Sequence, residues 1–220
     1  MPQWLAIAQH SNAYVMFVPE TARFASVVAS TDADLNFTKT NGWDDLRVPL
    51  TATKLGGSKD PSFAKVLDDG DGSQGVFAYQ FAHNQEQEVY FTLQLPHSWK
   101  LGSKIYPHVH WFPMTTDTGV VCFGLEYTWQ VKGAAFGNTN IIYGEKTIAT
   151  PSQFVHQYAD IDDEIDGAGI TEMSSMLICR VFRDVSVDGN LAAAVALLEI
   201  DFHIESDTVG SKEIFSKLGD

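Results

Sequence analysis

Cysteine and positive charge are both scarce in this sequence. Its two cysteines, Cys122 and Cys179, each lie inside an apolar segment, without the Cys-x-x-Cys spacing of a zinc or redox motif. We therefore expect two buried, reduced thiols. Lysine and arginine total 14 against 28 aspartate and glutamate residues, which gives a net charge of −14. A surface this acidic repels phosphate backbones, so nucleic acid is excluded as an expected partner. The charge suits solubility, cation binding or docking on a basic partner surface.

Long apolar runs are also missing. No segment reaches the roughly 18 consecutive apolar residues that a membrane-spanning helix needs. The N-terminus lacks the positively charged start and apolar stretch of a secretory signal. We therefore expect no membrane partner. Hydrophobic residues still make up 45% of the chain, and that content predicts a substantial folded core.

Alternation of apolar and polar residues is the main structural signal. Strict alternation predicts β-strands at residues 77–81, 89–95, 121–131 and 194–205, and an apolar run predicts a central strand at 176–185. In the last alternating strand, Leu198, Ile200, Phe202 and Ile204 are expected to point into the core. Turn residues at 83–84, 117–119 and 188–190 are typical of hairpins.

These patterns predict an all-β fold, an antiparallel β-sandwich of about eight or nine strands with a jelly roll as the preferred topology. Residues 43–220 are expected to form this domain. Residues 1–42 are expected to form an N-terminal arm or edge strands, and Tyr14, Phe17 and Phe24 in its apolar runs are candidate interface residues. One short helix is expected near residues 60–67, with Asp60 as its N-cap.

The segment 107–111 (PHVHW) carries the most suggestive chemistry. On a strand, His108 and His110 would project from one face, where two imidazoles can share a metal. Gly102 followed by this His-x-His matches the opening of a cupin metal motif, but the glutamate of that motif is absent. We therefore predict no bound metal or cofactor, with His108 and His110 as the candidate ligands if a metal is present.

A second group of ionisable residues shares one face of the last predicted strand: Glu199, Asp201, His203 and Glu205. Four ionisable groups on one face can bind a divalent cation or line a subunit contact, and solvation of an exposed strand face also explains the pattern. Should this face meet His108 and His110, the combined group would form a plausible metal site. The acidic turn at residues 68–73 lacks the distal glutamate of an EF-hand. No nucleophile motif or phosphate-binding loop is present, so we predict no catalytic residues and no enzyme.

A distinctive set of segments lies between residues 43 and 212: 43–50 (WDDLRVPL), 94–97 (QLPH), 107–111 (PHVHW), 124–129 (GLEYTW), 179–184 (CRVFRD), 199–203 (EIDFH) and 207–211 (DTVGS). Over these residues the chain resembles a family of virion structural proteins from tailed phages and prophages. The resemblance implies a jelly-roll-like body in the virion, assembled in the host cytoplasm, and brings no catalytic residues.

The first functional hypothesis is therefore a capsid decoration (cement) protein. It would be a homotrimer that bridges subunits of the major capsid protein. A neck, tail or fibre-attachment component is the alternative within the same class. A carbohydrate- or receptor-binding module, with Trp99, Trp111 or Tyr90 as stacking platforms, is a hypothesis of a different class, and a cupin-like metalloenzyme is a third.

Overall fold

The computed structural model describes residues 14–16, 27–29, 35–37, 42–68, 70–161, 164–211, 213–214 and 216–217. The strands of the body are β4 (Gly42–Pro49), β5 (Ser62–Leu67), β6 (Val76–Phe81), β7 (Glu88–Gln94), β8 (Ile105–Pro113), β9 (Gly119–Gln130), β10 (Asn140–Ile148), β11 (Gln157–Asp160), β12 (Met176–Asp184) and β13 (Val195–Ser206). Within the described ranges, the one helical element is a 3-10 turn, η1 (Leu50–Ala52), and no helix is long and apolar enough to cross a membrane.

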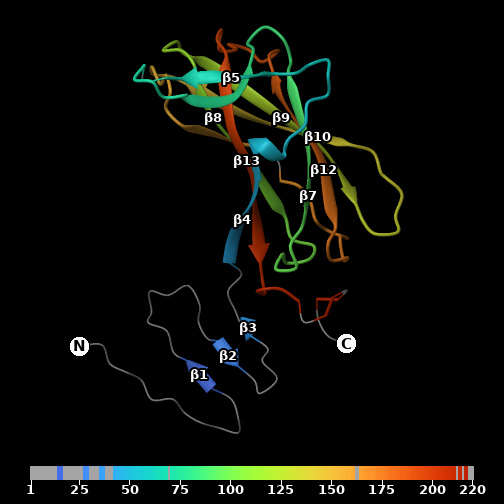
Figure 1. Cartoon of the computed structure of the whole chain (residues 1–220). Helices are drawn as coiled ribbons and strands as arrows, with labels where there is room; N and C mark the ends of the chain where they lie inside the picture. The colour runs from blue at the N-terminus through green and yellow to red at the C-terminus, as the bar shows by residue number, and fades with distance from the viewer. Residues whose placement is uncertain are drawn as a thin grey trace, which may run out of the picture.

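The body is a two-layer antiparallel sandwich with jelly-roll topology (Figure 1). Consecutive antiparallel pairs β6·β13, β7·β12, β8·β11 and β9·β10 form one long ribbon. Folding of the ribbon adds the pairs β8·β13 and β9·β12, which complete sheets of order β11-β8-β13-β6 and β10-β9-β12-β7. This order confirms the predicted sandwich and its jelly-roll winding.

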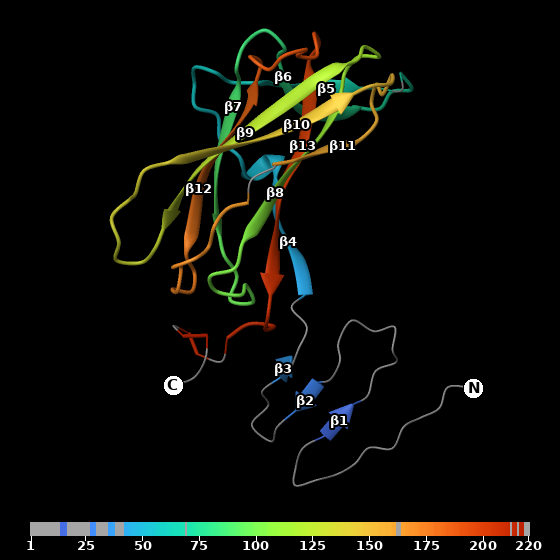
Figure 2. The same ribbon diagram turned by 180° about the vertical axis from the view of Figure 1, so that it is seen from behind.

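Two strands extend the first of these sheets. β5 pairs with β6 at the sheet edge, and β4 pairs with the C-terminal part of β13 (Figure 2). β13 is 12 residues long, so its N-terminal part pairs with β6 and its remainder with β4, while β8 runs along its other side. β13 therefore lies at the centre of the sheet that carries the candidate site.

The core fills the space between the sheets. Its largest fully buried side chains include Trp99, Trp111, Phe81, Phe123 and Phe202. Along β9 the face predicted to point inward is buried, with Val121, Phe123 and Leu125 fully so. The face predicted to lie outside has buried residues as well, namely Cys122, Gly124 and Thr128. The predicted central strand is β12, which lies between β9 and β7.

Two local predictions are wrong. A register shift between Leu197 and Glu199 reverses the alternation there, so Leu197 enters the main core and Leu198 packs against a smaller cluster. Residues 62–67 form strand β5 instead of a helix. Asp60 accepts a hydrogen bond from the backbone N–H of Gly57, and Val66 is buried against Ala78. Pairing with β6 satisfies this short backbone segment better than an isolated helical turn would.

The cysteines are buried in neighbouring strands, as predicted, and no disulfide joins them. Burial raises the pKa of the Cys179 thiol, which keeps it protonated and unreactive.

In the N-terminal region, the described residues form a small antiparallel sheet of β1 (Tyr14–Met16), β2 (Val27–Ala29) and β3 (Leu35–Phe37). Tyr14 lies in β1. The other candidate interface residues, Phe17 and Phe24, lie outside the described residues, and the proposed role of the arm stays a prediction.

Candidate functional site

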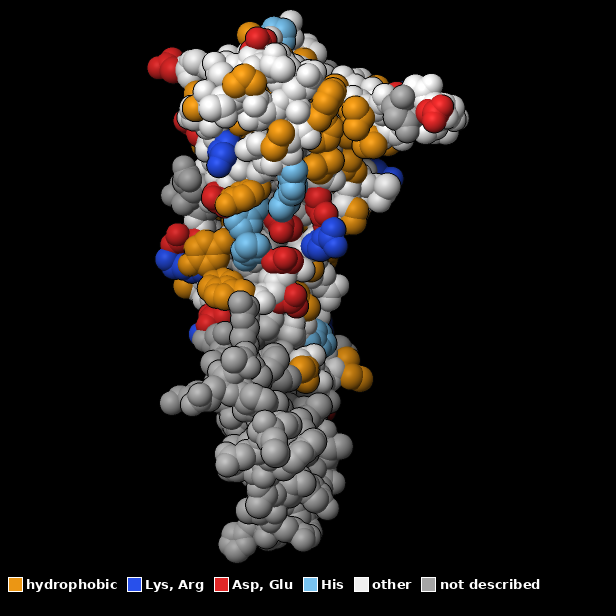
Figure 3. Space-filling view, turned by 90° about the vertical axis from the view of Figure 1, so that its left-hand side faces the viewer, with side chains coloured by type: hydrophobic (Ala, Val, Ile, Leu, Met, Phe, Trp, Pro, Cys, Tyr) orange, Lys and Arg blue, Asp and Glu red, His pale blue; other side chains and the backbone are white. Residues whose placement is uncertain are grey.

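A cluster of histidines and aspartates occupies the outer face of the sheet that contains β13. Strand register builds it. Asp201 of β13 is opposite His108 of β8, and His108 is opposite Asp160 of β11. In the neighbouring row, His203 of β13 is opposite Asp45 of β4. Figure 3 shows histidine side chains gathered in the middle of this face, with carboxylates beside them. We call His108, Asp201, His203, Asp45 and Asp160 the His–Asp cluster.

The imidazole of His108 lies between two carboxylates. Its Nε2 is 2.6 Å from Oδ1 of Asp160, and its Nδ1 is 3.5 Å from Oδ1 of Asp201. The interaction with Asp201 raises the pKa of His108, although partial burial acts in the opposite direction. Without another cation, the cluster therefore favours the imidazolium form of this histidine.

Asp201 is the buried acid of the cluster, with only 6% of its surface exposed. Burial alone would raise its pKa, but the contacts with His108 and His110 outweigh burial and lower the pKa below its ordinary value. Oδ1 lies 3.2 Å from Nε2 of His110, yet it has no aligned hydrogen-bond donor among the residues that the structure describes. A buried carboxylate oxygen without a well-aligned donor can still accept a hydrogen bond or bind a cation.

His203 lies beside His108 and Asp201, and these three residues form the central group of the cluster. Its Nε2 is 3.0 Å from Oδ1 of Asp45 and 3.8 Å from Oδ2 of Asp201. Its ring lies edge-on to that of His108, with centroids 4.1 Å apart. One donor atom from each of His108, Asp201 and His203 falls within 4.8 Å of the other two.

His110 and His156 extend the cluster toward β11. Nδ1 of His110 and Nε2 of His156 are 2.8 Å apart, within hydrogen-bond distance. Because Nε2 of His110 faces Asp201, this second histidine pair holds the ring of His110 against the buried carboxylate.

Aromatic side chains border the cluster. Trp43 of β4 is 59% exposed, and its ring packs edge-on against Tyr106 of β8 at 5.5 Å. Tyr158 of β11 is also exposed and contacts His108 from the other side. The face therefore combines a polar centre with exposed aromatic rings.

The aromatic platforms expected from sequence lie elsewhere. Trp99 and Trp111 are fully buried in the core, so neither is a stacking platform. Tyr90 lies on the outer face of the opposite sheet, where its hydroxyl donates to Glu88. On the face that carries the His–Asp cluster, Trp43 and Tyr106 form an exposed aromatic pair, although Tyr90 is as exposed as Tyr106.

Of the predicted metal candidates, the structure places His108 in the central group and His110 beside Asp201. It also places the charged face of β13 next to these two histidines. From the sequence, this contact is the requirement for a combined metal site. Sequence reasoning missed Asp45, Asp160 and His156. Asp45 and Asp160 lie on edge strands whose pairing partners were not predictable, and the His-x-Tyr-x-Asp spacing of residues 156–160 was the one available signal.

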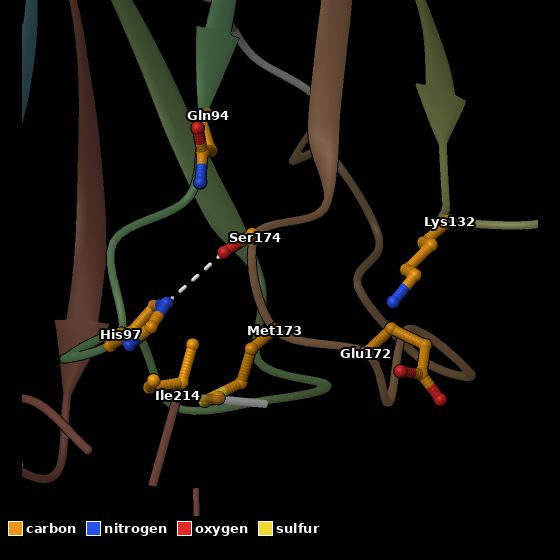
Figure 4. A pocket seen from close by; sticks show the side chains of 7 residues that line it. All are labelled: Gln94, His97, Lys132, Glu172, Met173, Ser174 and Ile214. Carbon is orange, nitrogen blue, oxygen red and sulfur yellow. Dashed lines mark hydrogen bonds between the residues drawn. The ribbon is translucent and has the colours of Figure 1, made fainter. Parts of the chain in front are cut away.

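Two hollows lie away from the cluster. One, of about 430 Å³, lies over β7, β9 and β12, where the guanidinium of Arg180 bonds to Glu88 and Glu126. The other, of about 440 Å³, lies between the turn before β12 and the C-terminal segment (Figure 4).

The second hollow contains a polar chain. Ser211 donates to the carbonyl of Glu213, so its oxygen is free to accept from Nδ1 of His97, and Nε2 of His97 lies 3.0 Å from the hydroxyl oxygen of Ser174. Lys217 pairs with Asp207 nearby. These bonds hold the C-terminal segment on the body, and we interpret them as an anchor.

No protein-family model and no curated protein matches the chain. Among solved structures, it is similar to one described as the structure of infectious bursal disease virus, Gx strain, with 10% identity, a TM-score of 0.37 and coverage of 96% of this chain. The chain spans 41% of the length of that viral chain. It is also similar to the carbohydrate-binding module CBM28, specific for non-crystalline cellulose, with 9% identity, a TM-score of 0.27 and coverage of 73% of this chain and 89% of the module. At such TM-scores neither likeness bears on function.

Proposed function

We propose that this protein is a non-enzymatic structural component of a tailed-phage particle. It decorates the capsid shell as a homotrimer and stabilises it by bridging subunits of the major capsid protein. The observation that carries the proposal is the sheet face of the jelly roll on which exposed Trp43, Tyr106 and Tyr158 border a polar centre. Exposed aromatic residues on such a surface are typical of protein–protein contacts.

Charge supports the same function. A net charge of −14 suits attachment to a basic surface and speeds the encounter with it. The resemblance of residues 43–212 to virion proteins of tailed phages supports the particle as the location. A jelly roll has few free sheet edges, so many copies can be packed side by side without strand pairing between them.

The test is quantitative mass spectrometry of gradient-purified particles, normalised to the major capsid protein. Decoration predicts one chain, or one trimer, for every few capsid subunits. A ratio near one in a hundred would replace decoration by a neck, tail or fibre-attachment role, and absence from the particles would overturn the virion assignment. Trp43→Ala should reduce the amount that remains on the particles, because it removes an exposed ring without disturbing the core.

A glycan- or receptor-binding module is the second candidate. The observation that favours it is the exposed Trp43–Tyr106 pair beside carboxylates, since sugars stack on aromatic rings and bond to acids. Its test is titration with a panel of soluble polysaccharides. Binding that is lost in Trp43→Ala and kept in Phe136→Ala, an exposed aromatic of a distant loop, would support it; no binding to any member would remove it.

A further inference from the structure

We propose that His108, Asp201 and His203 form a binding site for one divalent transition-metal ion of the zinc type. The site lies on the outer face of β8 and β13. It is independent of the proposed function, since it depends only on the local geometry, and it would exist in a particle protein and in a glycan-binding module alike.

The donor atoms have nearly the spacing that a metal requires. Nδ1 of His108 is 3.5 Å from Oδ1 of Asp201, and Nε2 of His203 is 3.8 Å from Oδ2 of the same carboxylate. Zinc bonds of about 2.0–2.2 Å at tetrahedral angles place ligand atoms roughly 3.3–3.6 Å apart. All three atoms lie within 4.8 Å of one another, so side-chain rotations are sufficient to close the site.

The state of Asp201 is a second, independent observation. Its carboxylate is buried, with 6% of the residue exposed, and among the described residues no donor makes a well-aligned hydrogen bond to its Oδ1, whose contacts are Nε2 of His110 at 3.2 Å and Nδ1 of His108 at 3.5 Å. A carboxylate oxygen is expensive to bury without a partner. A cation bound between Asp201 and the two imidazoles would give this oxygen a well-aligned partner.

The surrounding residues match the outer shell of a metal site. Nε2 of His108, the ring nitrogen that faces away from Asp201, bonds to Asp160 at 2.6 Å, which orients the ring and leaves Nδ1 for the metal. Carboxylate–histidine–metal arrangements of this kind recur in zinc proteins. Asp45, with its Oδ1 3.0 Å from Nε2 of His203, contacts one of the three proposed ligands and adds negative charge beside the site.

The donor set selects the class of metal. Two imidazole nitrogens and a carboxylate suit zinc and its first-row neighbours, whereas calcium and magnesium prefer all-oxygen sites. A bound ion would also connect β8, which carries His108, to β13, which carries Asp201 and His203.

The experiment is calorimetric titration of the untagged full chain, stripped of metal by a chelator, with zinc chloride. We expect one equivalent bound per chain. Asp201→Asn, nearly equal in size, should weaken binding at least 100-fold, and so should His203→Gln. Asp160→Asn should weaken it 10- to 100-fold, as is typical of outer-shell partners. His83→Ala removes an exposed histidine in the turn between β6 and β7 and should change nothing.

Cobalt(II) absorbance provides the second readout, because the intensity of its visible bands reports the coordination number. His203 is 41% exposed, so its substitution should leave the fold intact even if Asp201→Asn unfolds the chain. Equal zinc binding by the wild type and His203→Gln would overturn the site. Loss of binding in His156→Ala, with full binding in His203→Gln, would replace the ligand set by one centred on His110. Less than half an equivalent bound by the wild type would refute the proposal.

Discussion

His108 and Asp201 stand directly opposite each other on the antiparallel strands β8 and β13. A second register, between β8 and β11, places Asp160 on the other side of the same imidazole. Directly opposed side chains on one sheet face interact strongly, and a slip of one residue would turn each of them to the other face. The His–Asp cluster is thus a product of strand register, and it will be as stable as the pairing of these strands.

Zinc should stabilise the protein against unfolding. An ion that binds only the folded chain adds about 2.7 kcal/mol to the free energy of unfolding when its free concentration is about 100 times Kd. Urea titrations with zinc and with a chelator should therefore differ in midpoint for the wild type. The two curves should coincide for Asp201→Asn. A zinc-dependent shift of equal size in that variant would contradict the assignment of Asp201 as a ligand.

Gly144 keeps β10 close to the strand that carries Asp160. A Cβ atom at this position would overlap the backbone carbonyl oxygen of Asp160, an atom that cannot move without displacing β11. We expect Gly144→Ala to lower the free energy of unfolding by about 1–3 kcal/mol. Gly137→Ala is the matched control, since no atom lies within 4 Å of the added methyl group. The urea midpoints of the two variants are compared. Equal midpoints would show that β11 can shift to accommodate the methyl group without a loss of stability.

Part of this site was predictable from the sequence. Alternation along β8 and β13 is enough to place His108 with His110, and Asp201 with His203, on outward faces. The same alternation places Trp111 on the inner face, opposite in direction to His110, so its burial was predictable too. Burial of Trp99 was not, because it lies in an irregular connection.

The pairing between strands was not predictable. Jelly-roll winding brings β8 beside β13, more than 80 residues away in sequence, and no local pattern specifies that register. Asp45 and Asp160 enter the cluster from edge strands, and β11 is only 4 residues long, too short for a clear alternation. The register shift at Leu198 lies where β13 changes its partner on one side from β6 to β4 while it stays paired with β8 on the other. It therefore depends on the arrangement of the whole sheet.

Low pH should reduce the free energy of unfolding through protonation of Glu88. Burial tends to raise the pKa of this carboxyl, but hydrogen bonds from Tyr90 and Arg180 more than offset burial, and its pKa in the folded state is lowered. A lowered carboxyl pKa contributes stability above its unfolded value of about 4.3, and that contribution is lost as pH falls through the folded value.

The check compares urea unfolding of the wild type and Glu88→Gln from neutral pH downward. The wild type should be the more stable at neutral pH, and the difference should shrink as pH falls below about 4.3. Parallel curves over the whole range would mean that Glu88 does not contribute to acid sensitivity.

Arg183 is a cation inside the sandwich. It is fully buried, and its guanidinium donates to an unusual set of acceptors without any carboxylate: the carbonyls of Phe81, Leu191 and Ala193 and the side-chain oxygen of Asn190. Burial lowers its pKa to about 10, so it stays charged at neutral pH. The planar fork thereby joins the end of β6 to the segment that leads into β13.

Replacement of Arg183 by lysine should therefore be strongly destabilising. A lysine ammonium keeps the charge but cannot span acceptors arranged for a fork, and each buried acceptor left unpaired costs about 1–3 kcal/mol. We expect Arg183→Lys to lower the free energy of unfolding by at least about 2 kcal/mol. Arg47→Lys changes an exposed arginine that pairs with Glu199, and it should move the urea midpoint little. If Arg183→Lys and Arg47→Lys unfold at the same urea midpoint, the hydrogen bonds of the Arg183 guanidinium do not stabilise the contact between these segments.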